Sequence, residues 1–212
     1  MSTGRFITLE GIEGAGKSTV ARALQAELAR RGVPVLLTRE PGGTPLAETL
    51  RELLLRRGGE VINAVPETLL MFAARAVHLD NVIRPALASG RWVICDRFTD
   101  ASYAYQGAGR GLAMTLLDQL AIAVHADLWP ARTVLLDLPV AAGLARAQRR
   151  SGAADRFEAE QHQFFERVRS GYLQRAALDP RRVRVIDGQR ALAEVEAAAL
   201  GAIADLLPGP TP

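Results

Sequence analysis

Short apolar runs alternate along the chain with longer stretches in which apolar residues recur every three or four positions. The short runs predict strands at 5–10, 33–38, 91–96, 132–138 and 183–187. The longer stretches predict helices at 18–31, 45–57, 66–89, 112–124, 140–150, 157–177 and 191–206. In the first helix, Val20, Leu24 and Leu28 recur every four residues, and Gly32 follows its end.

The predicted strands are apolar on both faces and are separated by helices. This arrangement is typical of βαβ crossovers that bury a parallel sheet between two layers of helices. No internal repeat and no linker rich in Pro, Gly or Ser divides the chain. We therefore expect a three-layer α/β fold in a single domain at 1–207, followed by a frayed tail at 208–212.

The composition of the 212 residues excludes several other classes of protein. Hydrophobic residues make up 49% and charged residues 23%, which is typical of globular domains and not of disordered chains. No run of apolar residues is long enough to span a membrane, and the N-terminus lacks the apolar segment of a secretory signal. Cys95 is the only cysteine and cannot form an internal disulfide. These features predict a cytoplasmic protein without a membrane partner.

The basic residues single out one position. The net charge is +3, and Lys17 is the only lysine among 26 basic residues, the others being arginines. Solvated surface arginine and a phosphate-handling role are the two explanations of the basic balance, and surface arginine does not explain why one lysine is kept. The arginines are scattered in pairs and form no stripe with interleaved aromatic residues, so we expect no nucleic-acid partner.

Lys17 belongs to the segment 11–18, GIEGAGKS, which matches G-x-x-x-x-G-K-[ST] at every fixed position. The segment lies between the first predicted strand and the first predicted helix, as this motif requires. Glycines let backbone N–H groups surround an anion, and the helix N-terminus adds partial positive charge. Lys17 then supplies a mobile cation for the β- and γ-phosphates. The residues predicted to bind ATP are Gly11, Ile12, Glu13, Gly14, Ala15, Gly16, Lys17, Ser18 and Thr19.

The third predicted strand ends in Asp96 and Arg97. Asp96 is placed to serve Mg²⁺ together with the Ser18 hydroxyl, and Arg97 indicates a second phosphate beside the first. A phosphate loop alone does not separate kinases from ATPases and GTPases. The N-K-x-D signal of GTPases is excluded because the chain has no second lysine. We favour a kinase, with a kinase for another nucleotide or a deoxynucleoside, and a P-loop ATPase, as the alternatives.

Further motifs carry a resemblance to a known family. They are EGIEGAGKST (10–19), TREPGGT (38–44), MFAAR (71–75), CDRF (95–98), AYQG (104–107) and DRFE (155–158). Over nearly its whole length the chain resembles thymidylate kinases of the bacterial type. The resemblance implies a P-loop NTPase-type fold, with a five-stranded parallel sheet flanked by helices and a small lid at about 149–157. It also implies transfer of the γ-phosphoryl group of ATP to dTMP, and a homodimer.

The resemblance also implies which residues bind dTMP. Arg51 and Arg97 would hold its phosphate, and Arg75 and Gln106 would read the thymine edge. Tyr105 would lie under the deoxyribose, with a core tyrosine as the alternative. The family places a base-stacking phenylalanine four residues before the arginine, a position that Met71 occupies here; we assign the stacking to Phe72, with Met71 as the alternative. The expected dTMP-binding residues are Glu40, Arg51, Phe72, Arg75, Arg97, Ser102, Tyr105 and Gln106.

The phosphate loop contains no arginine, so the likeness is to the type that supplies a catalytic arginine from a lid. Arg149, Arg150 and Arg156 flank the segment SGAA at 151–154. A lid that closes over both phosphates excludes water and neutralises the charge on the transferred group. The residues predicted to be catalytic are Glu13, Lys17, Arg97 and Arg150, with Arg149 or Arg156 as alternatives to Arg150.

Overall fold

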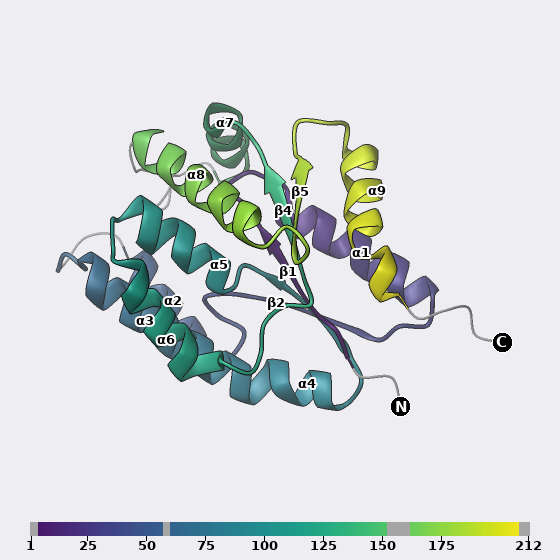
Figure 1. Cartoon of the computed structure of the whole chain (residues 1–212), viewed down its shortest axis with the longest axis horizontal. Coiled ribbons are helices and arrows are strands. Elements are labelled where there is room, and N and C mark those ends of the chain that lie inside the picture. Colours follow the sequence, from purple (N-terminus) through teal and green to yellow (C-terminus); the bar gives the residue numbers. More distant parts are fainter. Residues whose placement is uncertain (1–3, 57–59, 152–161, 208–212) are drawn as a thin grey trace.

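The computed structural model describes residues 4–56, 60–151 and 162–207. Five strands form one parallel sheet in the order β2-β3-β1-β4-β5 (Figure 1). The strands are β1 (Phe6–Glu10), β2 (Val35–Arg39), β3 (Trp92–Asp96), β4 (Arg132–Asp137) and β5 (Val183–Asp187). All of them begin and end within two residues of the predicted positions. The prediction of a five-stranded parallel sheet flanked by helices is confirmed.

Helices connect the strands and cover both faces of the sheet. They are α1 (Lys17–Arg30), α2 (Pro45–Leu55), α3 (Ala64–His78), α4 (Arg84–Ala88), α5 (Thr99–Ser102), α6 (Met114–His125), α7 (Val140–Ser151), α8 (His162–Leu178) and α9 (Leu192–Ala202), with the shorter turns η1 (Leu79–Ile83), η2 (Tyr103–Gly109) and η3 (Ala204–Leu206). Among the described residues, no helix is both long and apolar enough to cross a membrane.

Two helical segments differ from the sequence prediction. The single helix expected at 66–89 is divided into α3, the π-type turn η1 and α4. Pro85 at the start of α4 has no N–H to donate, and the wider turn precedes it. The hydrophobic pattern does not predict α5 and η2, because Gly107, Gly109 and several polar residues interrupt its periodicity.

The larger hydrophobic core lies between the sheet and the helices α1 and α9. These two helices lie on the same side of the sheet (Figure 1). Leu9, Ile94 and Val134 of the sheet pack with Leu24 and Leu28 of α1, and each of these side chains is at most 1% exposed. Burying one such side chain contributes about 1.5–3 kcal/mol relative to leaving it exposed. This core therefore holds β1 and α1 firmly on either side of the loop that joins them.

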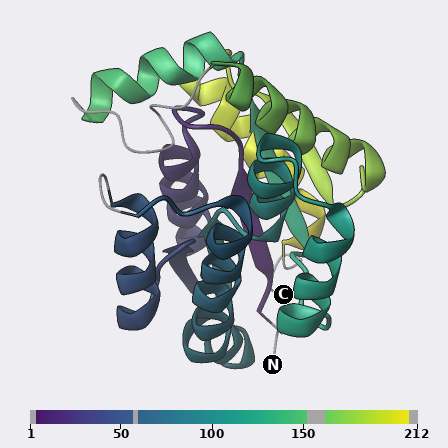
Figure 2. The ribbon, with the colours of Figure 1, turned by 90° about the vertical axis from the view of Figure 1, so that its left-hand side faces the viewer.

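The opposite face of the sheet is covered by the remaining helices. There α2 packs on α3, α3 packs on α6, and α8 packs on η2 (Figure 2). Phe164, Phe165 and Val168 of α8 cluster with Leu135 and Val183 from this face of β4 and β5. The packing of α8 against η2 positions the aromatic segment that follows β3.

All five strands run in the same direction, so their carboxyl ends lie at one edge of the sheet. The register pairs Asp96 of β3 with both Leu9 of β1 and Arg39 of β2, which places the three strand ends level with one another. The loops after these strands carry Glu13, Glu40 and Arg97. Ligands of open parallel α/β sheets bind outside this edge.

Candidate active site

The loop between β1 and α1 has the backbone that a phosphate cradle needs. Gly14 and Gly16 have φ values of +74° and +95°, a conformation that glycine adopts without strain. A Cβ atom at Gly14 would also collide with the carbonyl oxygen of Gly143, so this position accommodates glycine alone. Gly16 caps α1, and the first N–H groups of the helix therefore face the loop.

The Lys17 side chain folds back over this loop. Its Nζ donates to the carbonyl oxygens of Gly11 and Ile12, at 3.0 and 2.9 Å. Burial and the nearby Arg97 guanidinium lower the pKa of Lys17 to about 8, although neighbouring carboxylates including Asp96 oppose that shift. An anion bound in the loop would supply the negative charge that the buried ammonium group needs.

The two residues expected to serve a metal lie side by side at the mouth of the loop. The Ser18 hydroxyl donates to Asp96 Oδ2 over 3.0 Å, although the two residues are far apart in sequence. A hydroxyl and a carboxylate oxygen beside a phosphate site are the donors that suit Mg²⁺, a hard cation bound with few protein ligands and a substrate phosphate. The residues present fit that ion.

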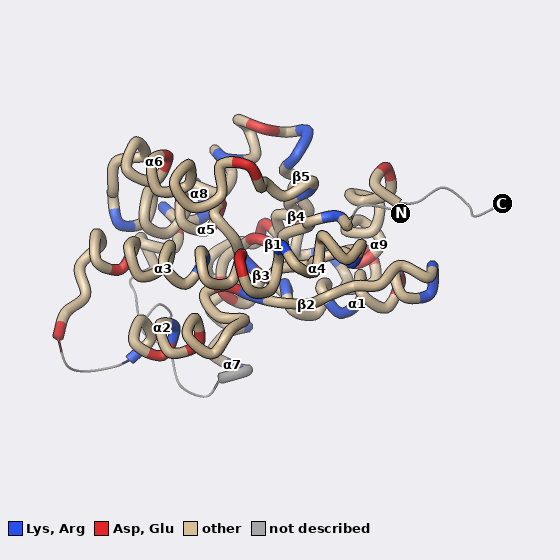
Figure 3. Tube along the Cα trace, turned by 90° about the horizontal axis from the view of Figure 1, so that it is seen from below, with Lys and Arg blue, Asp and Glu red and all other residues tan. Residues whose placement is uncertain are grey.

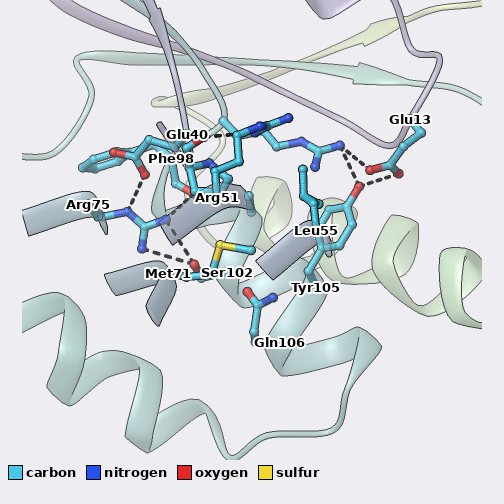
Figure 4. A pocket seen from close by; sticks show the side chains of 13 residues that line it. Glu13, Glu40, Arg51, Leu55, Met71, Arg75, Phe98, Ser102, Tyr105 and Gln106 are labelled. Atoms are coloured by element: carbon cyan, nitrogen blue, oxygen red, sulfur yellow. Dashed lines mark hydrogen bonds and ion pairs between the residues drawn. The ribbon is translucent and has the colours of Figure 1, made fainter. Parts of the chain in front are cut away.

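Glu13, Arg97 and Tyr105 form a closed group next to the loop, and Figure 4 labels Glu13 and Tyr105 of this group. Arg97 Nη2 donates to Glu13 Oε1 over 2.6 Å and to Tyr105 Oη over 2.9 Å, and Tyr105 Oη donates to Glu13 Oε2 over 2.7 Å. Burial would raise the pKa of Glu13, but the Arg97 and Lys17 charges and the two hydrogen-bond donors together lower it. Glu13 is therefore ionised and fixes the Arg97 guanidinium.

The backbone at Arg97 is held by a second buried carboxyl group. Arg97 has a φ of +72°, which is strained for a residue with a side chain. Glu10 accepts hydrogen bonds from the Phe98 N–H and the Tyr172 hydroxyl, both at 2.7 Å. Burial, reinforced by the charge of Asp100, raises the pKa of Glu10 to about 8. Glu10 thus anchors the turn that aims Arg97 at the loop.

A third buried carboxylate holds Arg75. Arg75 Nε donates to Glu40 Oε2 over 2.7 Å, and the guanidinium also donates to Ser102 Oγ at 3.2 Å. His78 Nδ1 lies 3.1 Å from Glu40 Oε1, and its Nε2 lies 2.6 Å from Thr38 Oγ1. Since a carboxylate only accepts, Nδ1 donates to Glu40, and Nε2 is left to pair with the Thr38 hydroxyl. Burial would raise the pKa of Glu40, but Arg75 and His78 lower it.

These groups border one cavity at the carboxyl edge of the sheet (Figure 4). Its lining residues are Glu13, Glu40, Pro41, Arg51, Leu55, Met71, Arg75, Arg97, Phe98, Ala101, Ser102, Tyr105 and Gln106. A second depression extends over the phosphate loop and Asp96, and it shares Glu13, Glu40, Arg51 and Arg97 with the first. A ligand in the cavity and a ligand on the loop would therefore meet at Arg97.

The structure gathers seven of the eight residues expected to bind dTMP around this cavity and leaves out Phe72. Phe72 is 1% exposed and packs in the core with Tyr103 and Leu117, under the Arg75 guanidinium. Met71 lines the cavity instead. The expectation that Phe72 stacks on the base therefore finds no support in the structure, and Met71 is the better candidate for covering the ring.

The expected lid residues are placed only in part. Arg149 is exposed near the end of α7. The Arg150 side chain and all of Arg156 lie outside the described residues, as do the tail at 208–212 and most of the segment assigned to the lid.

The sequence patterns do not single out Glu10, Glu67 and His78, all of which are fully buried in the structure. Glu67 accepts a hydrogen bond from Gln106 Nε2 over 2.9 Å. Glu40, His78 and Cys95 come close enough to suggest a metal site, but the ion pair with Arg75 and the hydrogen bond to Thr38 already account for Glu40 and His78. In the sequence, each appears only as an acid or a histidine within a predicted strand or helix, which does not by itself indicate burial.

Comparison with known proteins agrees with this geometry. The family model described as thymidylate kinase matches residues 9–199. A thymidylate kinase of Pseudomonas savastanoi pv. phaseolicola is 60% identical over 195 residues, covering 92% of each chain, and one of Nitrosomonas europaea is 54% identical over 205 residues, covering 97% of this chain and 94% of the other. A crystal structure of thymidylate kinase from Ehrlichia chaffeensis superposes with a TM-score of 0.77 at 34% identity, covering 95% of this chain and 99% of that one.

Proposed function

Because the chain belongs to the thymidylate kinase family, we propose how its residues divide the phosphorylation of dTMP between donor and acceptor. The enzyme is a nucleoside monophosphate kinase that converts dTMP to dTDP, a step in dTTP synthesis, with ATP as its co-substrate. The observation that carries the assignment of residues is the shared border of the loop depression and the cavity at Arg97 and Glu13.

On the donor side, the loop 11–19 binds the ATP phosphates through backbone N–H groups and the α1 N-terminus. Lys17 leaves its carbonyl partners and follows the β- and γ-phosphates. Ser18 and Asp96 would hold Mg²⁺, which would supply positive charge to the phosphates. Their hydrogen bond at 3.0 Å supports the assignment, since both side chains already reach one point.

On the acceptor side, Arg51 and Arg97 bind the phosphate of dTMP. One of its oxygens attacks the γ-phosphorus of ATP, the bond to the bridging oxygen breaks, and ADP leaves. Little covalent chemistry falls to the protein, so the rate depends on positioning and on charge stabilisation. Glu13 acts on this step by holding Arg97, whose guanidinium faces the junction of the two sites.

At the other end of the cavity, Arg75 and Gln106 read the base and Ser102 supports Arg75. Arg75 donates to the 4-oxo group of thymine, and Gln106 accepts from N3–H. Met71 and Phe98 supply the apolar surface that covers the ring. Tyr105 lies between the base-reading and phosphate-binding groups, under the deoxyribose, where it leaves no room for a 2′-hydroxyl.

The further assignments rest on the family resemblance. A single domain at 1–207 would close a lid at about 149–157 over the phosphates, with Arg149, Arg150 or Arg156 reaching the transferred group. Apolar side chains on α3 and α6 remain exposed, among them Leu69 at 50% and Ile122 at 67%, which supports a homodimer through the long helices. We place the enzyme in the cytoplasm.

Basic residues give no reason to add a nucleic-acid partner. Lysine and arginine segments are spread over many elements and mixed with acidic ones (Figure 3). A kinase and a nucleic-acid-dependent ATPase can be distinguished by measuring ADP release with different nucleotide acceptors and with DNA. We expect ADP release to require dTMP, to continue weakly with dUMP and to be nearly absent with dCMP. ADP release that ignores the acceptor or responds to DNA would contradict the assignment.

A further inference from the structure

Gln106 has one end in the cavity and the other in a buried cluster. It lines the cavity but is only 2% exposed, and its Nε2 donates to Glu67 Oε1 over 2.9 Å. In Figure 4 the side chain extends from η2 toward Met71, which lines the same cavity. Within the described parts of the chain, no hydrogen bond reaches Gln106 Oε1.

The chemistry of Glu67 determines which end of the amide it binds. Glu67 lies in the first turn of α3 and is 0% exposed. Arg110 Nε lies 3.6 Å from Glu67 Oε1, so a positive charge accompanies the carboxylate. An ionised carboxylate accepts hydrogen bonds and donates none, whereas an amide has a donating end and an accepting end. Glu67 therefore binds the NH₂ group of Gln106 and leaves the carbonyl oxygen for the cavity.

We propose that Glu67 is the positioning residue that sets acceptor specificity, by holding Gln106 with its carbonyl oxygen toward the base. The proposal rests on the proposed function, in which Gln106 reads the base edge. Thymine and uracil carry an N3–H that this oxygen accepts. Cytosine has a bare N3 that also accepts, so two acceptors would face each other without a proton between them. Without Glu67, the amide could turn and donate to cytosine.

The test is Glu67→Gln, which keeps size and shape but lets residue 67 present either end of an amide. We expect the ratio of kcat/KM for dTMP over dCMP to fall by about tenfold or more. The Gln106 carbonyl oxygen is then no longer fixed opposite the accepting N3 of cytosine. The ratio for dTMP over dUMP should stay within about twofold, because both bases carry the same N3–H and 4-oxo group. A cavity that had merely lost its shape would change both ratios.

Asp118→Asn is the matched control. Asp118 lies on α6 outside the cavity lining and accepts a hydrogen bond from Tyr103 Oη over 2.6 Å. The substitution therefore makes the same carboxylate-to-amide change at a position that is not next to the base. It should leave both acceptor ratios unchanged. Thermal unfolding of both variants shows whether each is folded.

A measurement on the wild-type protein tests the same proposal if the Glu67→Gln variant does not fold. With glutamine labelled by ¹⁵N, the Gln106 side-chain NH₂ should stay protected from solvent exchange when dTMP binds, because it remains on Glu67. Loss of that protection, or an unchanged dTMP-to-dCMP ratio in the folded variant, overturns the role of Glu67 and leaves the kinase assignment standing. A wild-type enzyme that does not prefer dTMP to dCMP overturns both.

Discussion

Glu40→Gln tests how much the buried ion pair with Arg75 stabilises the fold. Both side chains are 3% exposed, and Arg75 Nε lies 2.7 Å from Glu40 Oε2. The pKa of Glu40 is below its usual value despite burial, because Arg75 and His78 both favour the ionised form. The substitution keeps the volume of the side chain and one oxygen, but it removes the charge that compensates a buried guanidinium.

Removing one partner of a buried pair costs about 3–5 kcal/mol, since the other charge stays buried without compensation. Arg75 keeps its contacts with Ser102 Oγ and the Phe98 carbonyl oxygen, each at 3.2 Å, and the glutamine oxygen can still accept from it. We therefore expect a loss near the lower end, about 3 kcal/mol in the free energy of unfolding. The KM for dTMP should rise as well, because Arg75 loses its fixed orientation.

The assay is urea unfolding at neutral pH without nucleotide, since a bound ligand would itself stabilise the folded state. Asp127→Asn is the control. Asp127 makes two hydrogen bonds with Arg84, at 2.7 and 2.8 Å, but its side chain is 69% exposed. Solvent screens that pair, so its loss should hardly move the unfolding midpoint. Unfolding of Glu40→Gln at the same urea concentration as the control would refute a stabilising role for this ion pair.

Other expectations concern the reaction itself. Lys17→Met should fold normally and lose at least about 10²-fold in kcat in the ADP-coupled assay; retention of half the rate would exclude the phosphate-loop assignment. The kcat/KM for ATP should fall as the pH rises through about 8, where the free enzyme loses the Lys17 charge; a profile that stays flat well above that pH would contradict this. Tyr105→Ala should reduce the preference for dTMP over its ribonucleotide by about tenfold, whereas a merely structural tyrosine would affect both acceptors alike. Joint alanine substitution of Arg149, Arg150 and Arg156 should lower kcat far more than it raises the KM for dTMP, and full activity would exclude a lid arginine.

The sequence predicts best where a motif is local or where strand ends converge. The phosphate loop is eight consecutive residues, and its glycine conformations follow from the motif. Ser18 and Asp96 are distant in sequence, yet their meeting is predictable. Asp96 ends β3, and Ser18 lies in the first turn of α1, just after the loop that follows β1 at the same edge of the sheet.

The sequence is weakest where helix rotation decides which side chain reaches a cavity. Neighbouring residues of a helix point about 100° apart. The choice between Met71 and Phe72 therefore depends on how α3 is rotated against α5 and α6, which no local pattern records. The structure directs Phe72 into the core and Met71 into the cavity.

Buried acids were missed for a related reason. Glu67 in the first turn of a helix is typical of an exposed residue that favours the helix N-terminus. Its burial makes sense only with Gln106 and Arg110, which come from a segment whose helical turns the hydrophobic pattern does not predict. A residue whose partners arrive from elsewhere in the fold cannot be assigned before the fold is known.

Three buried carboxylates each hold one group that we propose to contact substrate. Glu13 holds Arg97, Glu40 holds Arg75, and Glu67 holds Gln106. Groups fixed before binding require no reorganisation when charge develops or a base enters. Because each carboxylate holds a different group, substitutions of Glu13 and Glu67 should have different effects on acceptor use. Changing Glu13 disturbs the phosphate end, which dTMP and dCMP share, so Glu13→Gln should slow both acceptors alike, whereas Glu67→Gln should change their ratio.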